Sequence, residues 1–247
     1  MNEFYSIASQ KNYPIFRTWG VFVGLLPYSI YIMTPLSYSS VSLGEFGFAF
    51  AIIISIFILS IGSLLAALFS KNPNIISSIG VLFAGFLYIS FSFYTLIYLR
   101  DLKFYGVENF GLILVFLMFG SIWTCDSAAY FVGRRFGKHK LMEHVSPKKT
   151  IEGAVAGFLG SVVFFIVASY YLLPHFNFVI TLIPGIIIGI FGQLGDLIES
   201  KIKRDADVKD SSHIIPGHGG ILDRFDSILF VSPILTVFFV LLKLYIR

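Results

Sequence analysis

Long apolar runs constrain this chain more than any other feature of its sequence. Seven such runs, almost free of charged residues, are separated by shorter polar segments. Each is near the roughly 20 residues that a helix needs to cross a bilayer, and a helix satisfies its own backbone hydrogen bonds in lipid. The pattern predicts an all-α, polytopic bundle of about seven membrane spans, at residues 19–36, 46–69, 75–99, 110–132, 153–173, 178–195 and 228–246.

The composition favours the same class of protein. Hydrophobic residues make up 56% of the 247 residues and charged residues only 13%, whereas a soluble domain carries about 25% charged residues. The single cysteine, Cys125, excludes an intramolecular disulfide and a multi-cysteine zinc site. We therefore expect a single integral membrane domain over residues 1–247.

The distribution of positive charge predicts the topology. If the N-terminus is cytoplasmic, fourteen of the 18 Lys and Arg residues lie in the inner segments 1–18, 70–74, 133–152 and 196–227. The positive-inside rule favours this orientation. Both long polar segments, 133–152 and 196–227, would then be loops that face the cytoplasm, where nucleotides and metal ions are available.

The most polar stretch runs from Ser200 to Asp226 and lies between two apolar runs. It combines carboxylates suited to a divalent metal, cations suited to phosphates, and a glycine turn at residues 216–220 whose N–H groups can face an anion. If the helix before it continues, four polar residues share one face: Asp196, Glu199, Ser200 and Lys203. A solvated helix end with ordinary side-chain pairing explains this spacing equally well.

Asp223 and Asp226 open the last apolar run, with Arg224 between them. A carboxylate at a helix start is favourable with the helix dipole and needs no ligand. Alternatively, the glycine turn holds Asp223 near a bound phosphate. Mg²⁺ usually takes one or two carboxylates plus phosphate oxygens, a number that Asp196 and Asp223 would supply. The spacing leaves both interpretations open.

Asp126 lies inside the fourth apolar run. An ionised side chain within a membrane helix costs roughly 2.5–3.5 kcal/mol on insertion scales, so we expect a partner or a wet cavity beside it. The alternative is an Asp that is protonated, or that reaches the interface and has only a structural partner.

A basic cluster follows at residues 134–149. Topology and attraction to anionic lipid head groups account for part of it. Residues 146–150 with Glu152 form a turn with hydroxyls, cations and a carboxylate that leads into a helix, which makes them a better candidate phosphate site. Among the histidines, His218 in the glycine turn is the functional candidate, whereas we expect no role for His139, His144 and His175.

Together these motifs resemble the phosphatidate cytidylyltransferase family. The family signature reads Ser, two residues, Lys-Arg, four residues, Lys-Asp, a short spacer, Pro-x-His-Gly-Gly, two residues and Asp-Arg-x-Asp. All its positions are met, by Ser200, Lys203, Arg204, Lys209, Asp210, Pro216, His218, Gly219, Gly220, Asp223, Arg224 and Asp226. Three further blocks agree, at residues 126–130, 146–153 and 195–200. The motif-bearing part is thus 110–247, and residues 1–109 resemble the family only in character.

Two features depart from the family pattern. Ala128 stands where members often have glycine. Members usually have one or two further apolar spans before a stretch that resembles residues 2–5, at which this chain begins. Compared with the family the sequence looks shortened at its N-terminus: either its start is misassigned, or this member does without those helices. The difference bears on stability and dimer packing more than on chemistry.

The resemblance implies Mg²⁺-dependent transfer of a cytidylyl group from CTP to phosphatidate, giving CDP-diacylglycerol and pyrophosphate. The charge asymmetry places this site at the cytoplasmic face, and no targeting segment is apparent, so we expect a bacterial inner membrane. Asp196 and Asp223 would hold Mg²⁺, and a second cation is left open. A homodimer is also left open, and no nucleic acid is expected. The implied catalytic residues are Asp126, Lys149, Lys209, Asp210, His218 and Asp226. The implied substrate-binding residues are Ser146, Lys148, Glu152, Ser200, Lys203, Arg204, Gly219, Gly220 and Arg224.

Other functions stay open at this point. A related transferase with a different lipid phosphate as acceptor would carry the same motifs. CDP-alcohol phosphotransferases need an Asp and Gly spacing that is not found here. A transporter would suit Asp126 and a sixth run broken by Pro184 and several glycines, although no inverted repeat is visible. An inactive homologue would have lost candidate ligands, and all of them are present.

Overall fold

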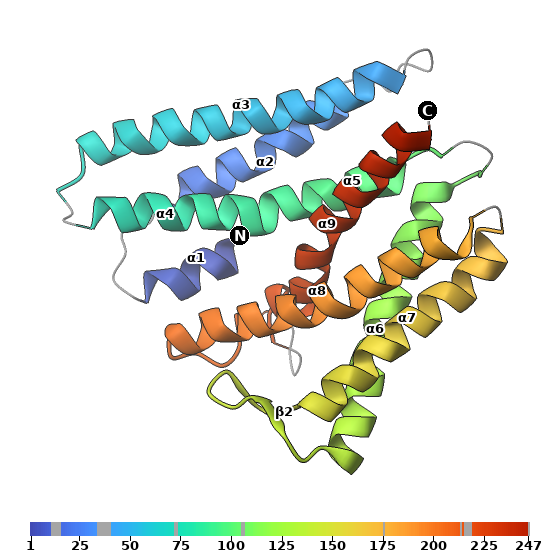
Figure 1. Ribbon diagram of the computed structural model, residues 1–247. Coiled ribbons are helices and arrows are strands. Elements are labelled where there is room, and N and C mark those ends of the chain that lie inside the picture. The colour runs from blue at the N-terminus through green and yellow to red at the C-terminus, as the bar shows by residue number, and fades with distance from the viewer. Residues whose placement is uncertain are drawn as a thin grey trace. The chain divides into compact units, whose positions relative to one another are not determined.

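The computed structural model describes residues 1–10, 16–33, 41–71, 74–104, 107–174, 176–212, 214 and 219–246. These residues form two compact units, Met1–Tyr94 with Asp210–Leu222, and Thr95–Lys209 with Asp223–Arg247. The structure is mainly helical (Figure 1). Its elements are α1 (Asn2–Ser9), α2 (Arg17–Met33), α3 (Val41–Leu68), α4 (Ile75–Gly85), the π-helix η1 (Phe86–Phe91), α5 (Ser92–Asp101), α6 (Phe110–Phe136), β1 (Lys140–Met142), β2 (Ser146–Thr150), α7 (Ile151–Leu172), α8 (Phe178–Asp205) and α9 (Leu222–Ile246).

Six helices in the described residues are long and apolar enough to cross a membrane. They are Ala49–Leu68, Ile75–Asp101, Phe110–Phe136, Ile151–Leu172, Phe178–Asp205 and Leu222–Tyr245. Within the described residues there are thus six such helices rather than the predicted seven or so. The first predicted run, at residues 19–36, falls on α2, which has 17 described residues, fewer than the roughly 20 required for a span; residues 34–36 of that run lie outside the described residues. Each of the other six predicted runs overlaps one of these helices.

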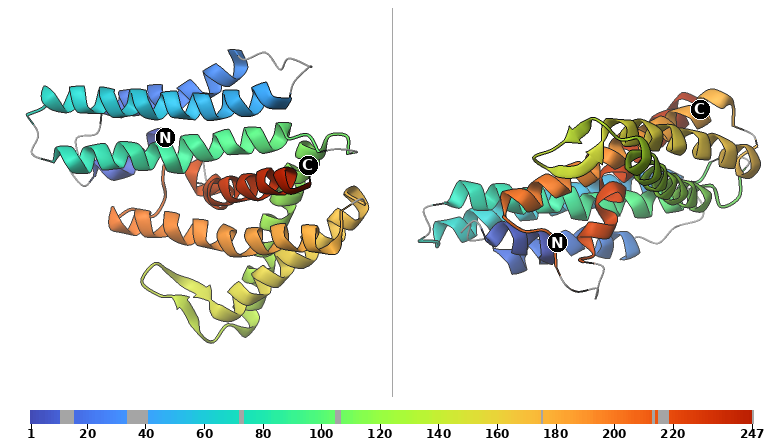
Figure 2. Two further views of the ribbon diagram at one scale, coloured as in Figure 1. Left: turned by 45° about the horizontal axis from the view of Figure 1, so that its top comes forward. Right: turned by 90° about the horizontal axis from the view of Figure 1, so that it is seen from below.

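In the first unit, α2, α3 and α4 lie side by side (Figure 2). The short helix α1 packs against α4. Tyr5 anchors this contact, because its side chain is fully buried and its hydroxyl donates to the carbonyl oxygen of Leu82 at 3.2 Å. A Cβ at Gly85 would lie 2.5 Å from the Tyr5 ring, so only glycine admits the ring there. The helix α1 is therefore held firmly within this unit.

In the second unit, α6 and α7 lie along one another (Figure 1). Small residues permit the approach, as at many membrane helix contacts. A Cβ at Gly157 would lie 2.8 Å from the carbonyl oxygen of Cys125, and one at Gly153 would lie 2.7 Å from that of Ala129. The helix α8 packs against both α7 and α6.

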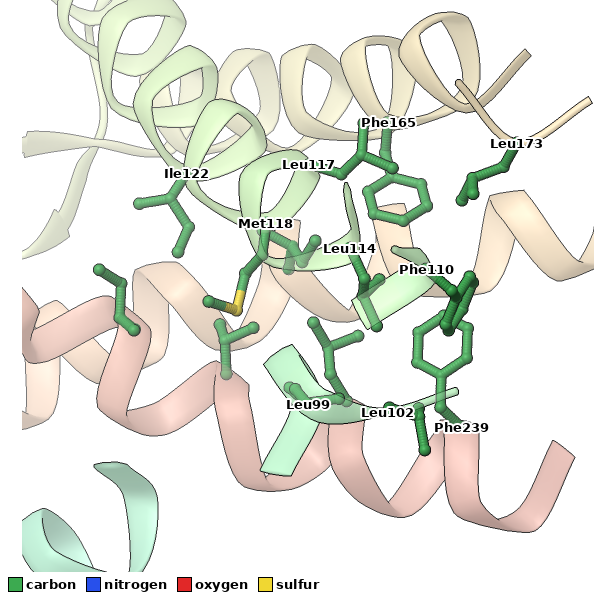
Figure 3. Packing of buried hydrophobic residues seen from close by; sticks show 14 residues of the cluster. Leu99, Leu102, Phe110, Leu114, Leu117, Met118, Ile122, Phe165, Leu173 and Phe239 are labelled. Carbon is green, nitrogen blue, oxygen red and sulfur yellow. The ribbon is translucent and has the colours of Figure 1, made fainter. Parts of the chain in front are cut away.

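An apolar core joins the helices of the second unit (Figure 3). Phe110 is stacked on Phe176, with 5.4 Å between ring centroids, and meets Phe239 edge-on at 5.5 Å. Such aromatic pairs add roughly 0.5–1.5 kcal/mol each beyond the burial of their surface. The buried core residues are Leu99, Leu102, Phe110, Leu114, Leu117, Met118, Ile122, Phe165, Leu173, Ile188, Ile228, Val231, Leu235 and Phe239.

Two further predictions about the polar segments are corrected. The chain is not purely α-helical, because β1 and β2 pair as an antiparallel hairpin between α6 and α7. Buried Val145 closes its turn through a hydrogen bond from its N–H to the carbonyl oxygen of Met142, at 3.1 Å. The segment 196–227 is not a loop throughout, because α8 continues to Asp205. The hairpin lies alongside this C-terminal half of α8 (Figures 1 and 2).

Candidate functional site

Carboxylates and lysines gather in the second unit at the polar end of α8. The prediction that Asp196, Glu199 and Lys203 would share a helix face rested on the continuation of this helix. The continuation is confirmed, since α8 runs without interruption from Phe178 through Pro184 to Asp205. It also removes the broken helix on which the transporter alternative rested.

The hairpin supplies the first ion pair of the site. Lys149 on β2 pairs through its Nζ with Oδ2 of Asp196 on α8. The hydroxyl of Ser200 donates to the other oxygen of Asp196 at 3.4 Å. Thr150, directly after Lys149, is the N-cap residue of α7, and its hydroxyl accepts a hydrogen bond from the Gly153 N–H at 3.2 Å. This cap fixes the backbone next to the lysine.

The second ion pair joins α8 to the start of α9. Nζ of Lys203 lies 2.8 Å from Oε2 of Glu199 and 2.6 Å from Oδ1 of Asp223. The side chain of Glu199 is 2% exposed and those of Lys203 and Asp223 are 12% exposed. Buried charges persist only when they are paired, so Lys203 balances two carboxylates at once.

Glu199 is a residue to which the sequence reasoning gave no final role. The signal was present, because Glu199 and Lys203 have the i,i+4 spacing of a helical ion pair. Its Oε1 atom is buried and has no hydrogen-bond partner among the described residues. Since Oε2, the other oxygen of Glu199, pairs with Nζ of Lys203, Glu199 positions Lys203.

Two more aspartates complete the cluster. Asp126 on α6 interacts electrostatically with Asp196 and Lys149, and Asp226 on α9 interacts with Asp196, Asp126 and Lys203. Close packing of α9 on α8 brings Asp226 there, since a Cβ at Gly195 would lie 2.8 Å from the carbonyl oxygen of Asp226. Four aspartates and two lysines from four different elements thus converge.

The chemistry of this cluster fits phosphate and a hard cation. Ammonium groups bind phosphate oxygens, and Mg²⁺ prefers carboxylate oxygens together with phosphates. No group of three or more His, Cys, Asp and Glu side chains in the described ranges is arranged to hold a metal ion by itself. A cation bound by Asp196 and Asp223 would therefore take its remaining ligands from substrate or water.

The other predicted residues of the hairpin lie at its base and on its surface. The Glu152 carboxylate accepts the backbone N–H groups of Lys138 and His139, at 3.1 and 3.2 Å, and lies 2.7 Å from Nδ1 of His139. Glu152 thus closes the hairpin, and His139, for which no role was expected, takes part in this contact. Lys148 is exposed, whereas Ser146 at the start of β2 is half-buried.

The remaining candidates lie around the polar segment after α8. Arg204 donates to the carbonyl oxygen of Val208 at 3.3 Å. Lys209 and Arg224 are exposed residues of the second unit, whereas Asp210, Gly219 and Gly220 belong to the first. His218 lies outside the described residues, as does His175. The structure thus brings together Asp126, Lys149, Asp196, Ser200, Lys203, Asp223 and Asp226 in one unit.

Comparison with known proteins identifies the family. The sequence model of the Cytidylyltransferase family matches residues 1–242. The chain belongs to the Cytidylyltransferase family. The match includes all the residues gathered at the polar end of α8.

Curated relatives in the Cytidylyltransferase family carry one name. The chain is 41% identical over 165 residues to a phosphatidate cytidylyltransferase of Bacillus subtilis, which covers 67% of this chain and 60% of the relative. It is 48% identical over 134 residues to the protein of that name from Staphylococcus haemolyticus, covering 54% and 52%. The chain thus matches between about half and three fifths of the length of these relatives.

Proposed function

We propose that this chain transfers a cytidylyl group from CTP to phosphatidate, giving CDP-diacylglycerol and pyrophosphate. The observation that carries the proposal is the convergence of four aspartates and two lysines at the polar end of apolar helices long enough to span a membrane. A water-soluble triphosphate and a lipid phosphate can both reach such a place. The names of the relatives support this choice of substrates.

The reaction needs no covalent bond to the protein, because phosphatidate is already an anionic nucleophile. An oxygen of its phosphate attacks the α-phosphorus of CTP and forms the new P–O bond. The bond from the α-phosphorus to the bridging oxygen breaks, and pyrophosphate leaves with that electron pair. Lys149 and Lys203 hold phosphate oxygens of the two substrates and reduce the repulsion between these anions.

Asp196 and Asp223 would hold Mg²⁺ at this site. When bound there, the ion would supply positive charge to neutralise negative charge that develops on the phosphate oxygens. In the structure each of these carboxylates is paired with a lysine. When a substrate phosphate takes up the lysine, the carboxylate becomes available to a cation, so binding of CTP and of the metal would support one another. Asp126 and Asp226 are two further carboxyl groups beside Asp196.

The site would face the cytoplasm of a bacterial cell from its inner membrane. The asymmetric distribution of Lys and Arg supports this orientation, and the relatives named above are bacterial proteins. The homodimer stays a prediction, which the mass of the detergent-solubilised protein would test.

The proposal is tested with labelled CTP, phosphatidate and Mg²⁺ added to detergent-solubilised chain. We expect label in a chloroform-soluble product, and loss of that product when EDTA removes the metal. Asp223→Asn should lower turnover at least about 100-fold, in the range seen when a transition-state contact is removed.

Glu108→Gln is the matched control, because Glu108 is exposed and distant in sequence from every candidate residue. It should keep the activity of the unchanged chain. Full activity in Asp223→Asn would contradict the role given to Asp223. Product with another lipid phosphate, and none with phosphatidate, would replace the proposed acceptor.

A further inference from the structure

The carboxylate of Glu3 lies at the centre of a hydrogen-bond cluster far from it in sequence. Glu3 belongs to α1, is 8% exposed, and accepts hydrogen bonds from residues 208 to 219 positions later. Its Oε1 accepts the Ser212 hydroxyl at 2.7 Å and the Ile221 N–H at 3.0 Å. Its Oε2 accepts the Ser211 hydroxyl at 3.1 Å and the Leu222 N–H at 2.7 Å. Each oxygen thus accepts one hydroxyl from residues 211–212 and one backbone N–H from residues 221–222.

That loop, residues 206–221, connects α8 to α9, and we call it the α8–α9 loop. Leu222 is the first residue of α9. The first N–H groups of a helix have no partner within it, and a carboxylate there interacts favourably with the helix dipole. Glu3 therefore caps α9 with a side chain from the opposite end of the sequence.

The glycines of the loop give a second, independent sign of this close contact. A Cβ at Gly220 would lie 2.8 Å from Oε2 of Glu3, equally close to the Ser212 hydroxyl, and would collide with the Ser211 hydroxyl. Gly219 has a φ of 77°, in the left-handed region that favours glycine. The backbone is shaped to pass directly over the Glu3 carboxylate.

Glu3 is itself held in place by its own helix. Tyr5, two residues later, is fully buried and bonded to Leu82. Asn2 accepts a hydrogen bond from Nε of Arg17 at 2.9 Å. Both contacts fix α1 independently of the α8–α9 loop. The position of the Glu3 carboxylate is therefore set by α1 and not by the loop.

We propose that Glu3 is a positioning residue, which fixes the α8–α9 loop and the first turn of α9 and thereby sets the placement of Asp223. Leu222, whose N–H is bound by Glu3, directly precedes Asp223 in the chain, and Asp226 follows one helical turn later. A displacement of the first turn of α9 therefore moves the carboxylates of both Asp223 and Asp226. The inference rests on the proposed function, because the two aspartates are assigned to the metal site of cytidylyl transfer.

Hydrogen exchange tests the structural half of this proposal without any need for activity. In Glu3→Gln one of the two acceptor oxygens is replaced by an N–H₂ group. We expect amide exchange at residues 221–226 to rise at least tenfold. Glu108→Gln is the matched control, since it makes the same carboxylate-to-amide change at an exposed residue outside α1 and the loop, and it should leave this exchange unchanged. Equal exchange in Glu3→Gln and the unchanged chain overturns the proposal.

The second measurement is the Mg²⁺ concentration that gives half-maximal transfer. A variant that only reduces the amount of folded protein lowers the maximal transfer rate but leaves the Mg²⁺ concentration at half-maximal transfer, the half-point, unchanged. Misplaced carboxylates should raise the half-point by about tenfold, the lower end of the range for residues that orient metal ligands. Glu3→Asp keeps the charge on a shorter side chain and should restore part of this shift.

An unchanged half-point in Glu3→Gln, with a lowered maximum, would reduce Glu3 to a stabilising residue and overturn the proposal. If the unchanged chain makes no lipid product, the proposed function fails, and exchange at residues 223–226 then decides the positioning role by itself. Where Glu3→Gln does not fold, Glu3→Asp is measured in both experiments in its place.

Discussion

Lys203 lies between Glu199, one turn before it on α8, and Asp223, at the start of α9. At this residue a single cation is shared by a buried carboxylate and a candidate metal ligand. The same ammonium group therefore has a part in stability and a part in phosphate binding, and the two can be separated by substitution.

Lys203→Met leaves Glu199 buried without its partner. Removing one member of a buried pair typically destabilises a protein by about 3–5 kcal/mol, so we expect a clearly lower midpoint in denaturant unfolding. Adding Glu199→Gln removes the unpaired charge and should recover most of this stability, while transfer activity stays lost. Recovery of activity in the double variant would show that Lys203 does not bind phosphate.

The environment of Glu3 predicts that the free energy of unfolding depends on pH. Burial raises the pKa of Glu3, but the hydrogen bonds from Leu222, Ser212, Ile221 and Ser211 together outweigh it, so its pKa lies below the ordinary value of 4.5. A carboxyl group whose pKa is lowered by folding stabilises the folded protein at pH values above its ordinary pKa. This stabilisation is lost as the pH falls through the lowered pKa of the folded state. The α-amino group of Met1 is a charged group that also interacts with Glu3.

We therefore expect the unchanged chain to be more stable than Glu3→Gln where Glu3 is ionised, and the difference in unfolding free energy to shrink as the pH falls below about 5. At higher pH, deprotonation of the Met1 amino group removes its attraction to Glu3, so the comparison starts below the range in which that group titrates. Unfolding in denaturant at a series of pH values measures the difference, and other carboxyl groups cancel in the comparison. A difference that grows as pH falls would mean that Glu3 is protonated in the folded protein.

At the scale of elements, sequence reasoning works where a pattern is long. Six apolar runs overlap the six long helices because about 20 apolar residues leave the backbone no other solution in lipid. The hairpin was missed because strands of three and five residues carry no readable period. The cap that Glu3 provides to α9 was missed because only the fold brings residues 219 positions apart together.

The α6–α7 contact gives a prediction about glycines. Gly157→Ala should lower the unfolding midpoint, because its Cβ would lie 2.8 Å from the carbonyl oxygen of Cys125, and overpacking costs about 1–3 kcal/mol. Gly80→Ala is the matched control, since no atom lies within 4 Å of the added Cβ. Each Gly→Ala change gains about 1 kcal/mol in helix propensity, so the difference between the two unfolding midpoints reports the effect of packing alone. Equal midpoints would mean that α6 and α7 are farther apart than described.

For the whole molecule, the prediction concerns the side of the membrane. In a Cys125→Ala background, single cysteines at His144 and Ile214, both exposed, should resist a membrane-impermeant maleimide in intact cells and react after lysis. A cysteine at Lys103, in an outer segment of the predicted topology, should react without lysis. The opposite pattern would reverse the proposed orientation.

The unbroken course of α8 has a consequence for how the lipid meets the nucleotide. Asp196 and Lys203 are seven residues apart on this helix, which at 1.5 Å per residue is about 10 Å along its axis. The polar layer of one leaflet is about 5–8 Å thick. The charged residues of α8 thus cover a distance comparable with the thickness of the layer in which lipid phosphates lie. In the reaction proposed above, phosphatidate would arrive by lateral diffusion and leave as the liponucleotide with its acyl chains in the bilayer throughout.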